Sequence, residues 1–181
     1  MSVKSITVFM GSQLGTDPEF TTMAADLGQA IAQRQMTLVY GGGRDGLMGV
    51  TARAAMAHDG RVIGISPRNL AEETMPATDI TQLITVETMS ERKELLMSLA
   101  DAFIVLPGGF GTLEELAQVL SWARIGLHHK PLVLLDVNGY YDHLWDWLAD
   151  SVTAGFAVPA DLATVRLCHS VDDALRYLDA I

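Results

Sequence analysis

Short runs rich in β-branched and apolar residues alternate with longer amphipathic segments along the whole chain. The strand-like runs are SITVFM, TLVY, RVIGIS, QLITV, DAFIVL, PLVLLD and TVRLC. Helix-like segments fill the intervals: 19–34, 46–59, one beginning near Ser90, one from Thr112, 140–152 and 171–180. Such alternation is typical of βαβ units. It predicts an α/β fold with a single Rossmann-like, doubly wound parallel sheet of about seven strands and helices on both faces.

The length and continuity of the chain indicate how many domains it forms. It has 181 residues, of which 49% are hydrophobic, so it can bury a full core. No internal repeat, low-complexity tract or linker interrupts the alternation. We therefore expect one domain over residues 1–181.

Charge and cysteine content narrow the range of partners. The formal net charge is -10 and the twelve lysines and arginines are scattered, which argues against a nucleic-acid surface. No apolar run reaches the length of a membrane span, and MSVKSITVFMGS is interpreted as a first strand and not as a signal peptide. The lone Cys168 cannot form an intramolecular disulfide. These features predict a cytoplasmic protein whose partner is a small molecule.

Three glycine-rich turns follow strands, where doubly wound sheets bind their ligands. MGSQLG follows the first strand and offers Ser12, as a ligand contact or as simple turn chemistry. YGGGRDGLMG follows the second strand and contains a G-x-G-x-x-G spacing. A dinucleotide fingerprint normally follows the first strand, with an acid closing the next, whereas here the next strand closes with Ser66, Pro67 and Arg68. Tight turning, close helix packing and phosphate contact therefore all remain open for this turn.

LPGGFGTLEE follows the fifth strand and supports two interpretations. Thr112 and Glu115 fit the T-x-x-E spacing of a helix capping box. The proline and glycines before them remove side chains where a ligand could touch backbone N–H groups. No lysine follows the glycines, so the turn is not a P-loop of nucleoside triphosphatases.

The segment TMSERKELL places two cations where a helix disfavours them. Thr88 or Ser90 is the expected N-cap, and Arg92 and Lys93 follow in the first turns. Cations near a helix N-terminus cost about 0.3–1 kcal/mol each unless an anion offsets them. The side chains are either solvated, or paired with a bound phosphate or with the carboxylate of Glu115.

Neither metal nor pyridoxal chemistry is indicated. His128 and His129 are adjacent, and no spacing of further ligands completes a metal site. A pyridoxal enzyme needs a Schiff-base lysine, and the chain has only Lys4, Lys93 and Lys130, none in a recognisable cofactor cradle. We expect no metal and no cofactor.

Taken together, YGGGRDGLMG, SERK, PGGFGTLEE and SWARIGLHHKPLVLLDVNGYYDHL resemble the LOG family of cytokinin riboside 5′-monophosphate phosphoribohydrolases, once described as lysine decarboxylases. The resemblance covers nearly the whole chain. It implies a cofactor-free homodimer that hydrolyses the N-glycosidic bond of AMP or of N6-modified (cytokinin) riboside 5′-monophosphates, releasing the free base and ribose 5-phosphate. The apolar stripes of LAQVLSWARIGL suit both a core and a subunit interface.

The resemblance also assigns residues. It places catalysis on Arg92 and Glu115, with Glu115 holding the ribose and stabilising the positive charge that develops as the bond breaks. The substrate-binding positions it implies, with Ser12 kept from the turn analysis, are Ser12, Gly42, Lys93, Gly108, Gly109, Phe110, Gly111, Thr112, Leu113, Glu114 and Ser121.

The chain departs from the family pattern at two positions. Ser90 stands where relatives usually have histidine, and Arg44 where they have a small or apolar residue. Contacts to the base are expected from variable segments such as 67–81. Two alternatives remain: a non-catalytic nucleotide-binding or sensor protein, and an NADP-binding oxidoreductase that uses YGGGRDG and Arg68.

Overall fold

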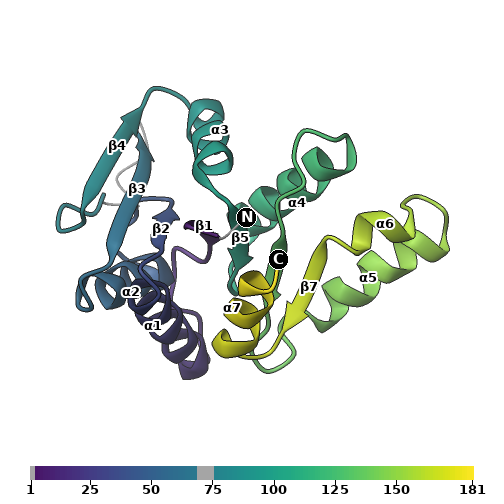
Figure 1. Cartoon of the computed structure of the whole chain (residues 1–181), viewed down its shortest axis with the longest axis horizontal. Helices are drawn as coiled ribbons and strands as arrows, with labels where there is room; N and C mark the ends of the chain where they lie inside the picture. The colour runs from purple at the N-terminus through teal and green to yellow at the C-terminus, as the bar shows by residue number, and fades with distance from the viewer. Residues whose placement is uncertain (1–2, 69–75) are drawn as a thin grey trace.

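A computed structural model describes residues 3–68 and 76–181, and part of the segment 67–81 expected to contact the base lies outside these residues. All seven strands join one parallel sheet in the order β4-β3-β2-β1-β5-β6-β7 (Figure 1). The strands are β1 Ser5–Phe9, β2 Thr37–Tyr40, β3 Arg61–Pro67, β4 Gln82–Val86, β5 Ala102–Val105, β6 Leu132–Leu135 and β7 Val165–Cys168. The predicted doubly wound sheet of about seven strands is confirmed.

Helices cover both faces of this sheet, as Figure 1 shows. They are α1 Pro18–Gln33, α2 Gly46–Met56, α3 Met89–Leu99, α4 Phe110–Arg124, α5 Asp142–Thr153, α6 Pro159–Leu162 and α7 Val171–Asp179. The short α6 was not expected from the sequence, because a single turn is too short to show a helical hydrophobic period. In the described residues no helix is long and apolar enough to cross a bilayer.

Alternate strand residues build two separate cores. Ile6 and Val8 of β1 pack with α1, α2 and α7 on one face, and Phe9 packs with α3, α4 and α5 on the other. Because both faces are buried there, β5 and β6 are apolar along their whole length, as in other parallel sheets with helices on both sides.

The order of the strands determines where a ligand can bind. Strand β1 pairs with β2 on one side and with β5 on the other. The chain leaves β1 for α1 on one face and leaves β5 for α4 on the opposite face, so the two loops diverge at this point. Such a switch point opens a crevice beyond the strand ends. The loops stay joined at its base, since Gly11 donates its backbone N–H to the carbonyl of Pro107 at 3.0 Å.

The starts of α3 and α4 differ from each other. Thr88 caps α3 in a capping box with Glu91, as one of the two predicted caps for that helix. Helix α4 begins at Phe110 with Gly109 as its N-cap and has no side-chain cap. The predicted capping box between Thr112 and Glu115 is therefore wrong. Thr112 is already the third residue of the helix, and its side chain is buried.

Candidate active site

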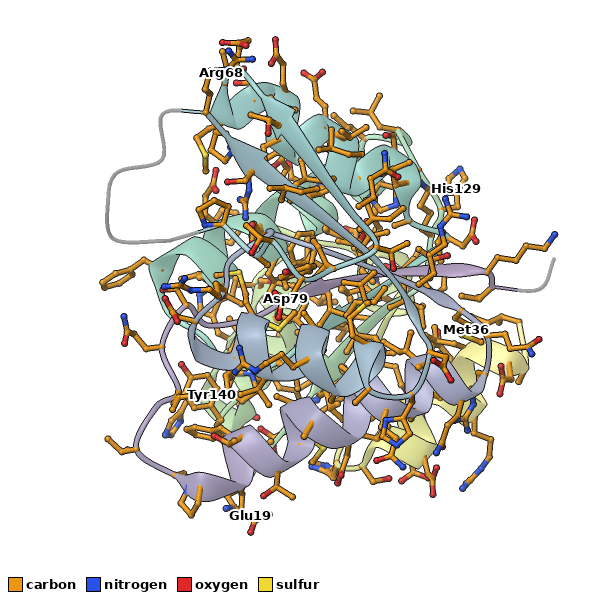
Figure 2. The ribbon with its side chains drawn as sticks, turned by 90° about the vertical axis from the view of Figure 1, so that its left-hand side faces the viewer. Glu19, Met36, Arg68, Asp79, His129 and Tyr140 are labelled. Atoms are coloured by element: carbon orange, nitrogen blue, oxygen red, sulfur yellow. The ribbon has the colours of Figure 1, made fainter. Side chains whose placement is uncertain are left out.

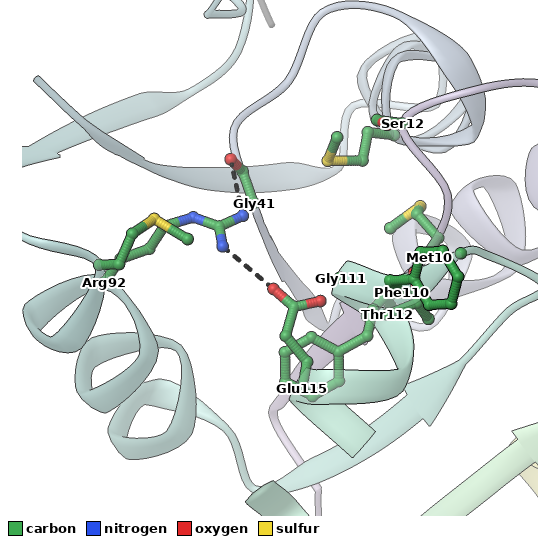
Figure 3. Close-up of a pocket in the computed structure, with 13 residues that line it drawn as sticks. Met10, Ser12, Gly41, Arg92, Phe110, Gly111, Thr112 and Glu115 are labelled. Atoms are coloured by element: carbon green, nitrogen blue, oxygen red, sulfur yellow. Dashed lines mark hydrogen bonds and ion pairs between the residues drawn. The ribbon is translucent and has the colours of Figure 1, made fainter. Parts of the chain in front are cut away.

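A pocket of about 260 Å³ lies beyond the carboxyl ends of β1 and β2, between α3 and the start of α4 (Figure 3). It is located beside the switch point of the sheet. Apolar strand ends and methionines form part of the wall, and an arginine, a glutamate and the first turn of α4 form the polar part. The lining residues are Val8, Phe9, Met10, Ser12, Gly41, Met48, Met89, Arg92, Gly109, Phe110, Gly111, Thr112 and Glu115.

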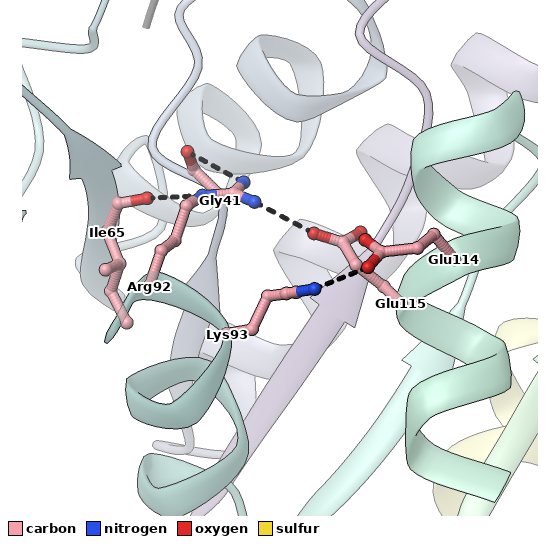
Figure 4. A network of polar contacts seen from close by, with 6 residues as sticks. All are labelled: Gly41, Ile65, Arg92, Lys93, Glu114 and Glu115. Atoms are coloured by element: carbon pink, nitrogen blue, oxygen red, sulfur yellow. Dashed lines mark hydrogen bonds and ion pairs between the residues drawn. The ribbon is translucent and has the colours of Figure 1, made fainter. Parts of the chain in front are cut away.

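Arg92 and Glu115 form a buried ion pair in this pocket. The Arg92 Nη1 donates to Glu115 Oε1 at 3.0 Å, and the two side chains are 10% and 12% exposed. The guanidinium also donates from Nε to the carbonyl of Ile65 at 3.0 Å and from Nη2 to the carbonyl of Gly41 at 3.3 Å. Figure 4 shows these three contacts converging on one side chain. The arginine is thus fixed by the ends of β2 and β3 before any ligand arrives.

The environment of Glu115 alters its acidity. Burial raises the pKa of the Glu115 carboxyl above its ordinary value, and the nearby charge and hydrogen bond of Arg92 oppose that rise. Burial has the larger effect because the carboxylate loses most of its hydration. A carboxyl group with a raised pKa is suited to exchange protons closer to neutral pH.

A second ion pair lies outside the first. Lys93 Nζ donates to Glu114 Oε1, and the Glu114 side chain is 54% exposed (Figure 4). Two neighbouring cations of α3 therefore meet two neighbouring carboxylates of α4. Of the predicted partners for Arg92, the carboxylate of Glu115 is confirmed and a solvated side chain is ruled out. Glu114 was not among the partners predicted for Lys93, which were solvent, a bound phosphate and Glu115.

The first turn of α4 leaves donors and space beside this pair. A helix has no internal acceptors for its first N–H groups, and no side chain caps them here. A Cβ added to Gly109 or to Gly111 would meet no atom within 4 Å, so the approach to these amides is open. Gly108 differs, because a Cβ there would lie 2.1 Å from Thr112 Oγ1. Helix dipole and free amides make such a turn a binding site for anions.

Not all predicted site residues meet in the pocket. Ser12, Gly109, Phe110, Gly111, Thr112, Arg92 and Glu115 line it. Gly108 lies behind Thr112, and Lys93 and Glu114 form the outer ion pair. The three others point elsewhere: Gly42 packs against Ile65 with φ +75°, while Leu113 and Ser121 are on exposed positions of α4.

The sequence missed six lining residues. Val8 and Phe9 were expected only as part of the first strand. Gly41 was considered only as part of the G-x-G-x-x-G spacing, and Met10, Met48 and Met89 gave no recognisable signal. Methionine is flexible and polarisable, so these three side chains form a wall that can adapt to different ligands.

The glycines of YGGGRDGLMG serve close packing in this structure. A Cβ on Gly46 would lie 2.2 Å from the carbonyl oxygen of Ser12, and one on Gly49 would lie 1.8 Å from that of Arg44. Of the interpretations left open for this turn, close packing is the one that these contacts bear out. Arg68 pairs instead with Glu87 at 3.1 Å.

The remaining lysine and histidine candidates lie away from the pocket. Lys130 Nζ donates to the carbonyl of Met97 at 2.7 Å, at the end of α3 remote from Arg92. His128 is hydrogen-bonded to the carbonyl of Val119 at 3.0 Å. Figure 2 shows His129 on the opposite side of the view from Tyr140, whose hydroxyl donates to the carbonyl of Gly108. None of the described residues that line the pocket is a lysine.

Comparisons with known proteins fit this architecture. Residues 48–178 match the family model described as "Possible lysine decarboxylase". A cytokinin riboside 5′-monophosphate phosphoribohydrolase of Rhodococcoides fascians is 42% identical over 97% of this chain and 89% of its own. One from Arabidopsis thaliana is 42% identical over 98% of this chain and 78% of its own.

Solved structures share the fold at lower identity. The molybdenum cofactor binding protein of Rippkaea orientalis superposes with a TM-score of 0.75 at 23% identity, covering 99% of this chain and 98% of its own. The molybdenum cofactor carrier protein of Chlamydomonas reinhardtii gives 0.74 at 23% identity, covering 98% of each. These two likenesses concern the fold alone. The family model and the curated relatives decide the family, and by them this chain is a member of the LOG family.

Proposed function

We propose that the protein hydrolyses the N-glycosidic bond of AMP or of N6-modified riboside 5′-monophosphates, giving the free base and ribose 5-phosphate. The names of the curated relatives support this activity. The observation that carries the proposal is the placement of a buried carboxylate, Glu115, one turn after an uncapped helix start in the same pocket. That arrangement combines an anion site with a group that stabilises positive charge.

The helix start of α4 holds the phosphate in this proposal. The amides of Phe110, Gly111 and Thr112 have no side-chain cap and line the pocket. Their dipole favours a dianionic phosphate. The Thr112 side chain lies in the same wall, and its hydroxyl is a further donor. The phosphate thereby fixes the position of the ribose relative to Glu115.

Glu115 acts on the ribose. As the bond from C1′ to the base nitrogen breaks, its electron pair goes to the base and C1′ gains oxocarbenium character. The carboxylate stabilises this charge and orients a water molecule whose oxygen bonds to C1′. The proton released by the water ends on the departing base. Arg92 keeps Glu115 ionised and aimed into the pocket through the 3.0 Å contact.

Release of base from AMP tests this function. The protein is incubated with AMP, and adenine and ribose 5-phosphate are separated and quantified against a sample without enzyme. Adenosine is the matched control, because it lacks the phosphate that α4 is expected to hold. The proposal fails if AMP binds and no adenine forms, which would identify a non-catalytic nucleotide-binding protein. Titration with NADPH tests the oxidoreductase alternative.

The protein is also proposed to form a homodimer through α4. Phe110 and Leu113 of α4 are 93% and 48% exposed, and Ile125 and Leu127, which follow the helix, are 66% and 63% exposed. Monomers seldom expose several large apolar side chains along one element, and a twofold axis buries one patch on both copies. We expect Ile125→Asp to lower the mass measured by light scattering from dimer to monomer. Leu14→Asp is the control: this exposed residue lies in the loop between β1 and α1, and its replacement should leave the mass unchanged.

The cytoplasmic location remains a prediction from the sequence. Fractionation of cells that produce the chain with a small C-terminal tag would test it. Recovery of the tagged chain in a membrane or extracellular fraction would contradict it.

A further inference from the structure

Gly41 lies against the Arg92 guanidinium, and a methyl group added to this glycine would collide with it. A Cβ on Gly41 would lie 2.1 Å from Arg92 Nη2 and 3.3 Å from Cζ. The third neighbour, Met48 Sδ at 3.2 Å, is the end of a flexible side chain that can shift by a few tenths of an ångström. The backbone of Gly41 does not have a left-handed φ, so alanine can adopt it without strain. The conflict is therefore with Arg92 itself.

The acceptors for this arginine exist because two strand ends approach closely. Gly42, with φ +75°, packs its Cα side against Ile65, and a Cβ on Gly64 would lie 2.9 Å from the Cα of Gly42. This close approach brings the carbonyl oxygens of Gly41 and Ile65 to one guanidinium. We call these two carbonyls, with the missing side chain at Gly41, the guanidinium seat.

We propose that Gly41 is a positioning residue for catalysis, which admits the Arg92 guanidinium into its seat and thereby holds Glu115 in the reactive orientation. Gly41 does not need to touch the substrate for this role. The proposal rests on the function proposed above and adds the residue on which the geometry of its ion pair depends. It also gives the YGGG turn a purpose other than dinucleotide binding.

The seat controls Glu115 because few other charges act on that carboxyl. Arg92 and Lys93 of α3 lower the pKa of Glu115, and Glu114 of its own helix raises it. Among these, Arg92 contributes most, through both its charge and its hydrogen bond. Displacing Nη2 tilts the guanidinium and weakens its contact with Glu115. The carboxyl then takes up a proton at higher pH, and its direction is less fixed.

A double-mutant cycle separates this role from general damage. Gly41→Ala, Arg92→Lys and the double variant are assayed for adenine release from AMP, with binding of AMP measured by calorimetry. We expect Gly41→Ala to lower kcat by about tenfold to a hundredfold, the range for loss of a charge-assisted hydrogen bond. In the Arg92→Lys background the same change should lower kcat less than about threefold, because lysine has no Nη2. Additive losses would overturn the proposal.

Two further readouts distinguish positioning from binding. The dissociation constant of AMP should change less than about threefold in Gly41→Ala, and the acidic limb of its pH–rate profile should move to higher pH. A control cycle pairs Gly41→Ala with Lys93→Met. The Lys93 side chain contacts Glu114 and not the seat. We expect additivity in that cycle. Equal coupling in both cycles, or an unshifted acidic limb, contradicts the proposal.

Folding provides the readout if Gly41→Ala is unstable. Removing the guanidinium then relieves the conflict, so Gly41→Ala with Arg92→Lys must fold better than Gly41→Ala alone. A double variant that unfolds equally would refute the role of the seat. A failure of the proposed function would look different, because the wild-type chain would then release no adenine. The stabilities of Gly41→Ala, Arg92→Lys and the double variant could still be measured, and their non-additivity would still test the seat.

Discussion

Replacing Glu115 by glutamine isolates the charge of the central carboxyl group. The variant keeps the size of the side chain and an oxygen that can accept from Arg92 Nη1. In the wild-type chain Nη1 lies 3.0 Å from Oε1 of Glu115. It removes the negative charge that faces the ribose in the proposed complex. The side chain is 12% exposed, so water cannot replace that charge effectively.

The size of the effect follows from the role of the group. A positioned acid or base contributes about 10²–10⁴ to the rate, which corresponds to about 2.7–5.4 kcal/mol of transition-state stabilisation. Loss of one partner from a buried ion pair costs about 3–5 kcal/mol of stability. Glutamine should cost less than that, because the guanidinium keeps its bonds to Gly41 and Ile65 and the amide oxygen replaces the carboxylate oxygen as acceptor for Nη1.

The assay is adenine formation in a single turnover, with enzyme in excess over AMP, so that product release does not mask the chemical step. Circular dichroism and thermal unfolding show whether each variant is folded. Glu114→Gln is the matched control, because its partner pair is exposed and such pairs contribute about 0–1 kcal/mol. It should lose at most about fivefold. A folded Glu115→Gln within threefold of the wild-type rate, or an equal loss in the control, would refute the reasoning.

Three further predictions concern stability and the phosphate site. Burial raises the pKa of Glu115, so between the ordinary carboxyl pKa and that raised value the folded state holds more protons than the unfolded state. The contribution of this group to the free energy of unfolding therefore falls as pH rises. Urea unfolding at stepped pH should show that Glu115→Gln loses this pH-dependent contribution, and a difference between the two chains that stays constant across pH would contradict it. Thr88→Ala removes the cap of α3 and should cost about 0.5–2 kcal/mol, measured as a lower midpoint in urea with an unchanged slope; a midpoint equal to that of the wild type would show that the cap adds nothing. Gly108→Ala brings a methyl group to 2.1 Å from Thr112 Oγ1 and to 2.9 Å from the Gly11 nitrogen. The variant should bind AMP more weakly and lose about 1–3 kcal/mol of stability. An unchanged affinity in calorimetry would show that this turn does not hold the phosphate.

The hydrophobic pattern predicted most of the fold. Strand runs such as those around Ile6 and Ile104 are continuous and apolar, because both faces of a parallel sheet are buried. The amphipathic period of α1 and the N-cap of α3 are also local, since they depend on residues within a few positions of each other. Short-range signals of this kind can be read without knowing the tertiary structure.

The start of α4 shows where local signals become ambiguous. T-x-x-E is the spacing of a capping box, and Thr112 with Glu115 satisfies it in the sequence. The same glutamate is needed by a buried arginine that comes from α3. Since Gly109 is the N-cap of the helix and Arg92 binds Glu115, the local option is not used. Nothing in the ten residues around Thr112 could decide between these partners.

By itself the sequence determined the class of the fold and the three glycine-bearing turns that lead to the pocket. It left the partner of Arg92 open between solvent, a bound phosphate and the carboxylate of Glu115. Only the tertiary structure decided which atoms meet. Strand order placed β1 between β2 and β5 and so opened the pocket at their ends. The close approach of Gly42 to Ile65 supplied the acceptors for Arg92. Such contacts join residues far apart in the chain, and their distances depend on how the sheet and its helices pack as a whole.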